Sequence, residues 1–375
     1  MLRENPFDQG LGLYVHVPFC KKKCDYCSFY SKIPSNNDIE LYLNRLSQEF
    51  RDRLTPELTS RIQTVFVGGG NPTALGRHGM KNLIDLLLTV SLKSPIREWT
   101  IESNPETLDP EVSKILFGIP HFRLSLGIQR LKNHELKILG RDTSMEKCME
   151  ALDRAFSITS RVSIDLIIGV PGCDSIVTDL SNLLARFPIS HVSTYFLSAE
   201  NGTPLMEKIL RGKFGDPNDV GPEELFDVID LLTSRNFEHY EISNFAISTR
   251  KCLHNLNYWR TGDYLGFGPS AVTTLRNARY SNSASLQTWL QNFIPGTEEL
   301  SLEIRRKEFI MLGLRLLSEG LSLELFENRF GPISAKQKEI LISQVSAGKI
   351  SLKNSVYRLT RTGLPFANSI ISELF

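Results

Sequence analysis

The chain has 375 residues, of which 41% are hydrophobic, so it can bury a large core in two or three domains or in one large barrel with an appendage. Its 43 basic and 42 acidic residues leave a formal net charge of +1, which argues against nucleic acid as a partner. Residues 1–11 lack the apolar core of a signal peptide, and no stretch approaches the roughly 20 apolar residues of a transmembrane helix. We therefore expect a cytoplasmic protein, for which only transient membrane association remains open.

Strand-like runs alternate with helix-like segments through the first 200 residues. The runs are rich in β-branched and aromatic residues, and they read GLYVHVPF, TVFVGG, WTIESN, RLSLGIQ, RVSIDLIIG and HVSTYFLS. The segments between them place apolar residues on one helical face, as residues 38–54 do with Tyr42, Leu46 and Phe50. This alternation predicts an α/β fold with a parallel sheet. About six βα units, fewer than the eight of a full barrel, favour a partial (β/α)6 barrel over residues 12–200, with a doubly wound sheet as the alternative.

The pattern changes after residue 200. Residues 201–300 contain charged turns, a helix-like ELFDVIDLLTSRNF, a short strand in HYEISNFA and an aromatic, glycine-rich stretch without periodicity. We interpret them as a segment that flanks the barrel. Residues 301–375 contain three further helix-like runs and are predicted to form a small, mainly helical C-terminal domain. Residues 1–11 form an N-terminal tail in this division of the chain.

Unusual residues lie where the predicted parallel strands end. The carboxyl ends of such strands gather on one rim, where ligands bind. The features expected at this rim are a cysteine-rich loop after the first strand, GGGNPT after the second, Glu102, Gln129, Asp165 and Tyr195. Although they span about 180 residues of sequence, they are predicted to line one cavity.

Three of the six cysteines, Cys20, Cys24 and Cys27, form a C-x3-C-x2-C pattern. In the cytoplasm thiols stay reduced, so a metal site is favoured over disulfides. A zinc site would need a fourth ligand, for which His16 is the candidate. An iron–sulfur cluster held by three thiolates would instead leave one iron open to an exchangeable ligand, and flanking aromatic residues favour such a shielded cluster. Purely structural thiols are the third alternative.

The cysteine pattern, with the aromatic Tyr26 before the third cysteine, resembles the radical S-adenosylmethionine (SAM) superfamily. The resemblance implies that the three cysteines hold a [4Fe–4S] cluster whose open iron is chelated by the amino and carboxyl groups of SAM. It further implies that an electron from the cluster cleaves SAM to methionine and a 5′-deoxyadenosyl radical, so that an electron donor is a partner.

The resemblance also implies a set of SAM-binding residues. Gly69 and Gly70 let backbone approach a ligand closely, although a glycine run after a strand is often only a turn. Asn71 stands where the family is expected to carry threonine. Polar residues at buried strand ends hold the ribose, adenine and amino-acid parts of SAM or, alternatively, form an internal ion-pair network. These residues are Glu102, Gln129, Arg130, Arg141 and Asp165, and the resemblance adds Tyr14 and Tyr26 to the SAM site.

A closer resemblance covers nearly the whole chain. The segments YVHVPFCKKKCDYCSF, VFVGGGNPT, RLSLGIQ, SIDLIIGVPG, HVSTYFLSAENGTPL and HNLNYWRTGDYLGFGPSA resemble the oxygen-independent coproporphyrinogen III oxidase family. The oxidase branch carries a fourth cysteine two residues after the third, where this chain has Phe29, and a longer segment before the first strand. The H-N-x-x-Y-W motif formed by His254, Asn255, Tyr258 and Trp259 resembles the haem chaperone branch instead.

The haem chaperone branch implies a protein that binds haem and passes it to an acceptor protein, with the cluster and SAM as a switch or stabiliser. His254 is then the candidate axial ligand and Tyr258 the next candidate, while Tyr258 and Trp259 pack on the porphyrin with Asn255 beside them. Two alternatives stay open. One is oxidative decarboxylation of coproporphyrinogen III, against which Phe29 argues, and the other is a zinc-holding structural protein.

Overall fold

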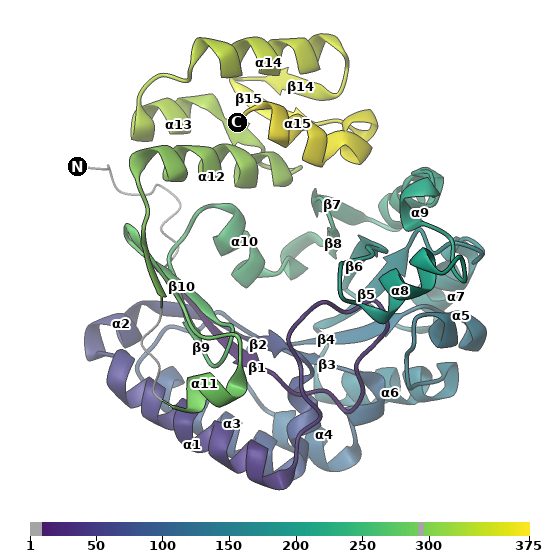
Figure 1. The fold of residues 1–375 in the computed structure, drawn as a ribbon, viewed down its shortest axis with the longest axis vertical. Coiled ribbons are helices and arrows are strands. Elements are labelled where there is room, and N and C mark those ends of the chain that lie inside the picture. Colours follow the sequence, from purple (N-terminus) through teal and green to yellow (C-terminus); the bar gives the residue numbers. More distant parts are fainter. Residues whose placement is uncertain (1–9, 292–295) are drawn as a thin grey trace.

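The computed structural model describes residues 10–291 and 296–375, so most of the predicted tail, residues 1–11, lies outside the described residues. The core of the fold is one twelve-stranded sheet with the order β12-β11-β10-β9-β1-β2-β3-β4-β5-β6-β8-β7 (Figure 1). Its centre consists of parallel strands: β1 (Leu11–Val17), β2 (Ile62–Gly69), β3 (Glu98–Ser103), β4 (Phe122–Gln129), β5 (Val162–Ile168) and β6 (His191–Phe196).

The central strands follow one another in space as they do in sequence, and this order decides between the two predicted arrangements. A doubly wound sheet reverses its strand order at a switch point, whereas β1 to β6 never do, so the fold is the predicted partial barrel. The helices that connect the strands are α1 (Asn36–Arg53), α2 (Pro56–Arg61), α3 (Gly76–Ser91), α4 (Pro110–Leu116), α5 (Asn133–Ile138), α6 (Met145–Ile158) and α7 (Val177–Arg186). Helix α1 begins at a capping box of Ser35 and Asp38 and buries Tyr42, Leu46 and Phe50, the face predicted from sequence.

Residues 201–300 extend the central sheet at both of its edges. The hairpin of β7 (Phe237–Glu241) and β8 (Asn244–Ile247) adds to β6, while β9 (Tyr264–Phe267) runs parallel to β1. Three antiparallel strands follow β9: β10 (Val272–Leu275), β11 (Ala278–Ser281) and β12 (Gly296–Glu299). The helices of this segment are α8 (Pro204–Leu210), α9 (Glu223–Ser234), α10 (Leu253–Trp259) and α11 (Leu286–Leu290).

The C-terminal region is mainly helical, as predicted. Its helices are α12 (Leu302–Arg315), α13 (Leu323–Phe330), α14 (Ala335–Ser346) and α15 (Ala367–Glu373). They pack on a three-stranded sheet that the sequence analysis did not predict, made of β13 (Leu321–Ser322), β14 (Ile350–Lys353) and β15 (Val356–Leu359). Helix α12 contacts α10, and Figure 1 shows it above the strands β9 and β10. Within residues 10–291 and 296–375, no helix is both long and apolar enough to cross a membrane.

Candidate functional site

The cysteine loop after β1 is closed at its base and tied to the rim of the barrel. The backbone N–H of Lys32 donates to the carbonyl of Pro18 (2.8 Å), and that of Cys20 donates to the carbonyl of Lys32 (3.1 Å). In the middle of the loop, Asp25 pairs through its backbone with Leu139 (3.2 Å) and Leu205 (2.8 Å). The loop therefore has a defined path over the carboxyl ends of the strands.

The glycine run after β2 is shaped by its contact with this loop. The N–H of Gly70 donates to the carbonyl of Val17 (2.8 Å), and a Cβ atom at Gly70 would lie 2.6 Å from the carbonyl oxygen of Phe19. Gly69 has φ +105°, a conformation that a side chain disfavours. Gly70 thus lets the start of the cysteine loop approach β2, while Gly69 leaves room for the ring of His16 on β1.

Most of the predicted SAM and cluster residues converge on one cavity of about 490 Å³, which we call the cluster cavity. Its lining includes Cys20, Cys24, Cys27, Tyr26, Gly69, Gly70, Glu102, Gln129, Arg141 and Asp165. Tyr195, predicted at the rim, also lines it. Arg123 and Ser125 also line the cavity but were not predicted; they lie two residues apart on β4, in phase with Gln129. The alternation of strand side chains could have identified them.

Arg141 is the buried cation at the cysteines. Its Nη1 donates to the sulfur of Cys24 (3.5 Å) and to Oδ1 of Asn104 (3.3 Å), and its Nη2 donates to the carbonyl of Gly127 (2.8 Å). Burial raises the pKa of Cys20 to about 11 and holds the pKa of Cys27 above its usual range. Both thiols are therefore protonated at neutral pH until a cation displaces their protons, and bound iron would supply that charge.

Glu102 lies at the end of β3 with one oxygen facing the glycine run. The N–H of Gly69 donates to its Oε2 (3.2 Å). Burial and the nearby Asp165 raise the pKa of Glu102 to about 7, and burial also raises the pKa of Asp165. The two carboxyl groups therefore hold fewer than two negative charges at neutral pH.

Four residues considered for the cluster or SAM sites do not line the cluster cavity: Tyr14, His16, Asn71 and Arg130. Asn71 is buried in an internal network, where its amide donates to Thr107 (2.8 Å) and accepts from Thr73 (2.9 Å). Tyr14 and His16 face a second cavity and are hydrogen-bonded to each other (2.9 Å).

The position of His16 bears directly on the zinc alternative. Burial lowers the pKa of His16 to about 4, so the ring is neutral, but it does not join the cysteines. Among the residues that the structure describes, no three His, Cys, Asp or Glu side chains lie close enough together to hold a single metal ion. The closed tetrahedral site that the zinc alternative requires is therefore not formed by His16, whereas three cysteines around a cavity fit a cluster that is larger than one ion.

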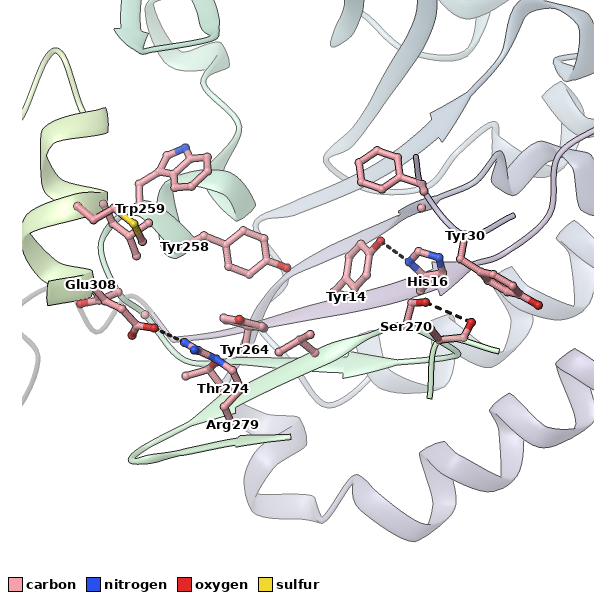
Figure 2. Close-up of a pocket in the computed structure, with 18 of the residues that line it drawn as sticks. Tyr14, His16, Tyr30, Tyr258, Trp259, Tyr264, Ser270, Thr274, Arg279 and Glu308 are labelled. Carbon is pink, nitrogen blue, oxygen red and sulfur yellow. Dashed lines mark hydrogen bonds and ion pairs between the residues drawn. The ribbon is translucent and has the colours of Figure 1, made fainter. Parts of the chain in front are cut away.

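The second cavity is larger, with a volume of about 780 Å³, and lies between β1, β9, β10, α10 and α12. Figure 2 shows the rings of Tyr14, Tyr258, Trp259 and Tyr264 around it. This cavity adjoins the cluster cavity, because Ser28, Phe29, Gly69 and Glu102 line both. A ligand in one cavity would therefore lie next to a ligand in the other.

The H-N-x-x-Y-W motif is divided between the two cavities. Asn255 lines the cluster cavity, whereas Tyr258 and Trp259 line the second. His254 lines neither: it is fully buried, with Nδ1 hydrogen-bonded to Thr64 Oγ1 (2.8 Å) and Nε2 to the hydroxyl of Tyr258 (2.8 Å). Burial lowers its pKa to about 3. The predicted axial ligand thus has both nitrogens engaged, and the structure places Tyr258 at the cavity instead.

A partial barrel that carries a three-cysteine loop on its rim, with the cluster cavity beneath the loop, is the arrangement of a radical SAM protein. The chain matches the radical SAM superfamily over residues 14–174 and the HemN C-terminal domain over residues 300–366. It belongs to the HemW family. The heme chaperone HemW of Lactococcus lactis is 30% identical over 326 residues, which cover 84% of each chain. The heme chaperone HemW of Bacillus subtilis is 28% identical over 95% of this chain and 97% of its own.

The fold also matches a solved structure, that of coproporphyrinogen III oxidase (HemN) from Escherichia coli, described as a radical SAM enzyme. The TM-score is 0.79 at 20% sequence identity, over 98% of this chain and 91% of the other. This likeness shows a shared fold. Membership of the radical SAM superfamily implies a [4Fe–4S] cluster and SAM, and the cluster cavity offers the donor set that both require.

On the hypothesis that Glu102 binds SAM, which the family resemblance implies, its pKa predicts a pH dependence of SAM binding. The ionised carboxylate is the form that accepts hydrogen bonds from ligand hydroxyls and attracts the positive charge of SAM. With a pKa of about 7, roughly a tenth of it is ionised at pH 6 and roughly nine tenths at pH 8, so affinity should rise about tenfold over this range. Isothermal titration of the cluster-loaded protein would measure this rise. Glu102→Gln should bind weakly without pH dependence, while Glu111→Gln, outside both cavities, should behave as the wild type; a wild-type affinity that is constant from pH 6 to 8 would refute the role of Glu102.

Proposed function

We propose that the protein is a haem chaperone that binds haem in the second cavity and transfers it to an acceptor protein. The observation that carries this proposal is the aromatic-lined cavity of about 780 Å³ that shares a wall with the cluster cavity. Its size lies in the range of small-molecule and cofactor sites, and its tyrosine and tryptophan rings suit a flat macrocycle. The HemW relatives, which are named heme chaperones, support the same assignment.

Within this site the motif on α10 has separate tasks. Tyr258 is the candidate axial ligand, because its hydroxyl belongs to a residue that lines the cavity and tyrosine can ligate haem iron. His254 holds that hydroxyl through Nε2, and its Nδ1 is fixed by Thr64. His254 is therefore a positioning residue in this proposal, and Trp259 supplies an aromatic wall.

The cluster cavity would hold its cofactors with residues of this chain. Cys20, Cys24 and Cys27 would bind the [4Fe–4S] cluster, and Glu102, Gln129 and the strand-end residues around them would bind SAM. When bound, such a cluster with one open iron supplies an electron to SAM. Helix α10 connects the two cavities, because Asn255 lines the cluster cavity and Tyr258 lines the second cavity. A ligand that moves α10 in one cavity would therefore change the other, which supports a switch or stabiliser role for the cofactors. The proposed partners are a haem acceptor and an electron donor.

Two measurements on one preparation test the proposal. The cluster-loaded protein is titrated with haem under nitrogen, and a separate sample receives SAM, a reductant and coproporphyrinogen III. We expect a saturable Soret band at about one haem per chain and no protoporphyrinogen. Conversion of coproporphyrinogen III at enzymatic turnover would favour the decarboxylase, whose fold this chain shares, and would overturn the chaperone assignment.

A further inference from the structure

Arg305 is a buried guanidinium in the wall of the second cavity without a carboxylate of its own. It lies on α12, one turn before Glu308, and its side chain is 5% exposed. Its Nε has no hydrogen-bond partner, and within residues 10–291 and 296–375 Arg305 forms no ion pair. Arg279, on the same side of the cavity, differs because it pairs with Glu308 (Figure 2) and also with Glu298 (3.5 Å).

A second cation lies behind the same wall. Nη1 of Arg329 donates to Oγ1 of Thr261 (3.1 Å), a residue that lines the cavity, and its Nε also has no hydrogen-bond partner in the part of the chain that the structure describes. Burial and the nearby Arg305 lower the pKa of Arg329 to about 10, so the two guanidinium groups repel each other. Asp263 acts on Arg329 in the opposite direction, but the described residues contain no ion pair between the two.

A buried guanidinium beside a partly buried one, neither paired with a carboxylate of the described residues, is costly, and an anionic ligand group would compensate both. A planar guanidinium presents paired N–H donors that match a carboxylate. Figure 2 shows Arg279 and Glu308 at the end of the cavity away from His16 and Tyr30, and Arg305 precedes Glu308 by one helical turn. The cavity therefore has a cationic end toward the C-terminal helices and an aromatic middle.

We infer that Arg305, supported by Arg329, binds the propionate carboxylates of haem and so fixes the orientation of the macrocycle. The inference rests on the proposed function and adds the orientation of haem within the second cavity. The propionate edge lies against α12, and the opposite edge of the ring points toward Gly69 and Glu102, at the wall shared with the cluster cavity. The aromatic residues of α10 contact the face of the ring.

The test compares haem with its dimethyl ester, which keeps the iron and the ring but lacks both negative charges. Each is titrated into the cluster-loaded protein and followed by the Soret band. Because a charge-assisted hydrogen bond contributes a factor on the order of ten to a hundred in affinity, the wild type should prefer haem by about that factor. Arg305→Gln should lose most of this preference and Arg305→Lys should keep part of it. Lys307→Gln, on the same helix and paired with Glu303, should keep all of it.

The outcomes separate this inference from the proposed function. Equal affinity of the wild type for haem and its ester, or an Arg305→Gln variant with the wild-type preference, would overturn the inference and leave haem binding intact. Failure of the wild type to bind either compound would overturn the proposed function itself. Equal affinity of the wild type for the two ligands would overturn the inference even if the variant does not fold.

Discussion

Replacing any one of Cys20, Cys24 and Cys27 by serine should give a protein that folds but keeps almost no iron. After anaerobic reconstitution the wild type should hold about four iron and about four sulfide ions per chain with a broad brown absorbance. Each serine variant should fall close to zero, because the two remaining thiolates do not hold a cluster. Iron and sulfide analysis, with circular dichroism for the fold, would measure this loss.

Cys173→Ser is the matched control for this experiment. Cys173 is also a free, partly exposed thiol, but it lines neither the cluster cavity nor the second cavity. The Cys173→Ser variant should keep the wild-type iron content. If a serine variant of the loop did so as well, the assignment of the three cysteines as cluster ligands would be wrong.

The second large effect is expected at Arg130, which lies just beyond β4 and is fully buried. Its Nε donates to Glu135 (2.9 Å) and its Nη1 to Glu224 (3.2 Å), and it also binds the carbonyls of Ile167 (3.1 Å) and Asp174 (2.7 Å). Arg130→Met would leave Glu135 buried without its cation. Since breaking a buried ion pair on one side costs about 3–5 kcal/mol, we expect a loss of that size in the free energy of unfolding.

Denaturant unfolding of Arg130→Met and Lys132→Met would check this expectation. Lys132 forms a partly exposed ion pair with Asp174 (3.0 Å), and such pairs contribute at most about 1 kcal/mol. The lysine variant should therefore unfold near the wild-type midpoint. Equal stability losses in both variants would show that the Arg130 network does not stabilise the rim. Arg130 thus belongs to an internal ion-pair network, the alternative to SAM binding that its position at a strand end allowed.

The sequence was most informative where local patterns determine structure. The six βα units and the three-cysteine loop follow from the order of strands and helices and from residue spacing, because parallel strands must present their carboxyl ends on one rim. The same reasoning predicted that Glu102, Gln129, Asp165 and Tyr195 line one cavity, as they do, whereas Arg141 was added by the family resemblance. Strands β9 to β12 were not predicted, because they have only four residues each and form through pairing with β1 and with one another.

The roles of the remaining site residues depend on tertiary packing, which the sequence does not reveal. The spacing of His254 and Tyr258 places them on one face of a helix, but only the contact of α10 with β2 shows that His254 bonds to Thr64 and turns away from both cavities. The interior role of Asn71 depends in the same way on Thr73 and Thr107, which no local pattern links to it. The unpaired Arg305 had no signal in the sequence, since neither its burial nor the absence of a partner is visible there.

The central claim is that the second cavity holds haem and that the adjoining cluster cavity holds the cluster. The most direct measurement is a haem titration of Met311→Trp, which places a large ring in the second cavity. The control is the same titration of Ile342→Trp, which carries the same ring at an exposed position on α14. We predict that Met311→Trp binds haem at least about tenfold more weakly than the wild type with an unchanged iron and sulfide content, and that Ile342→Trp matches the wild type in both. Wild-type haem affinity in Met311→Trp would contradict the claim.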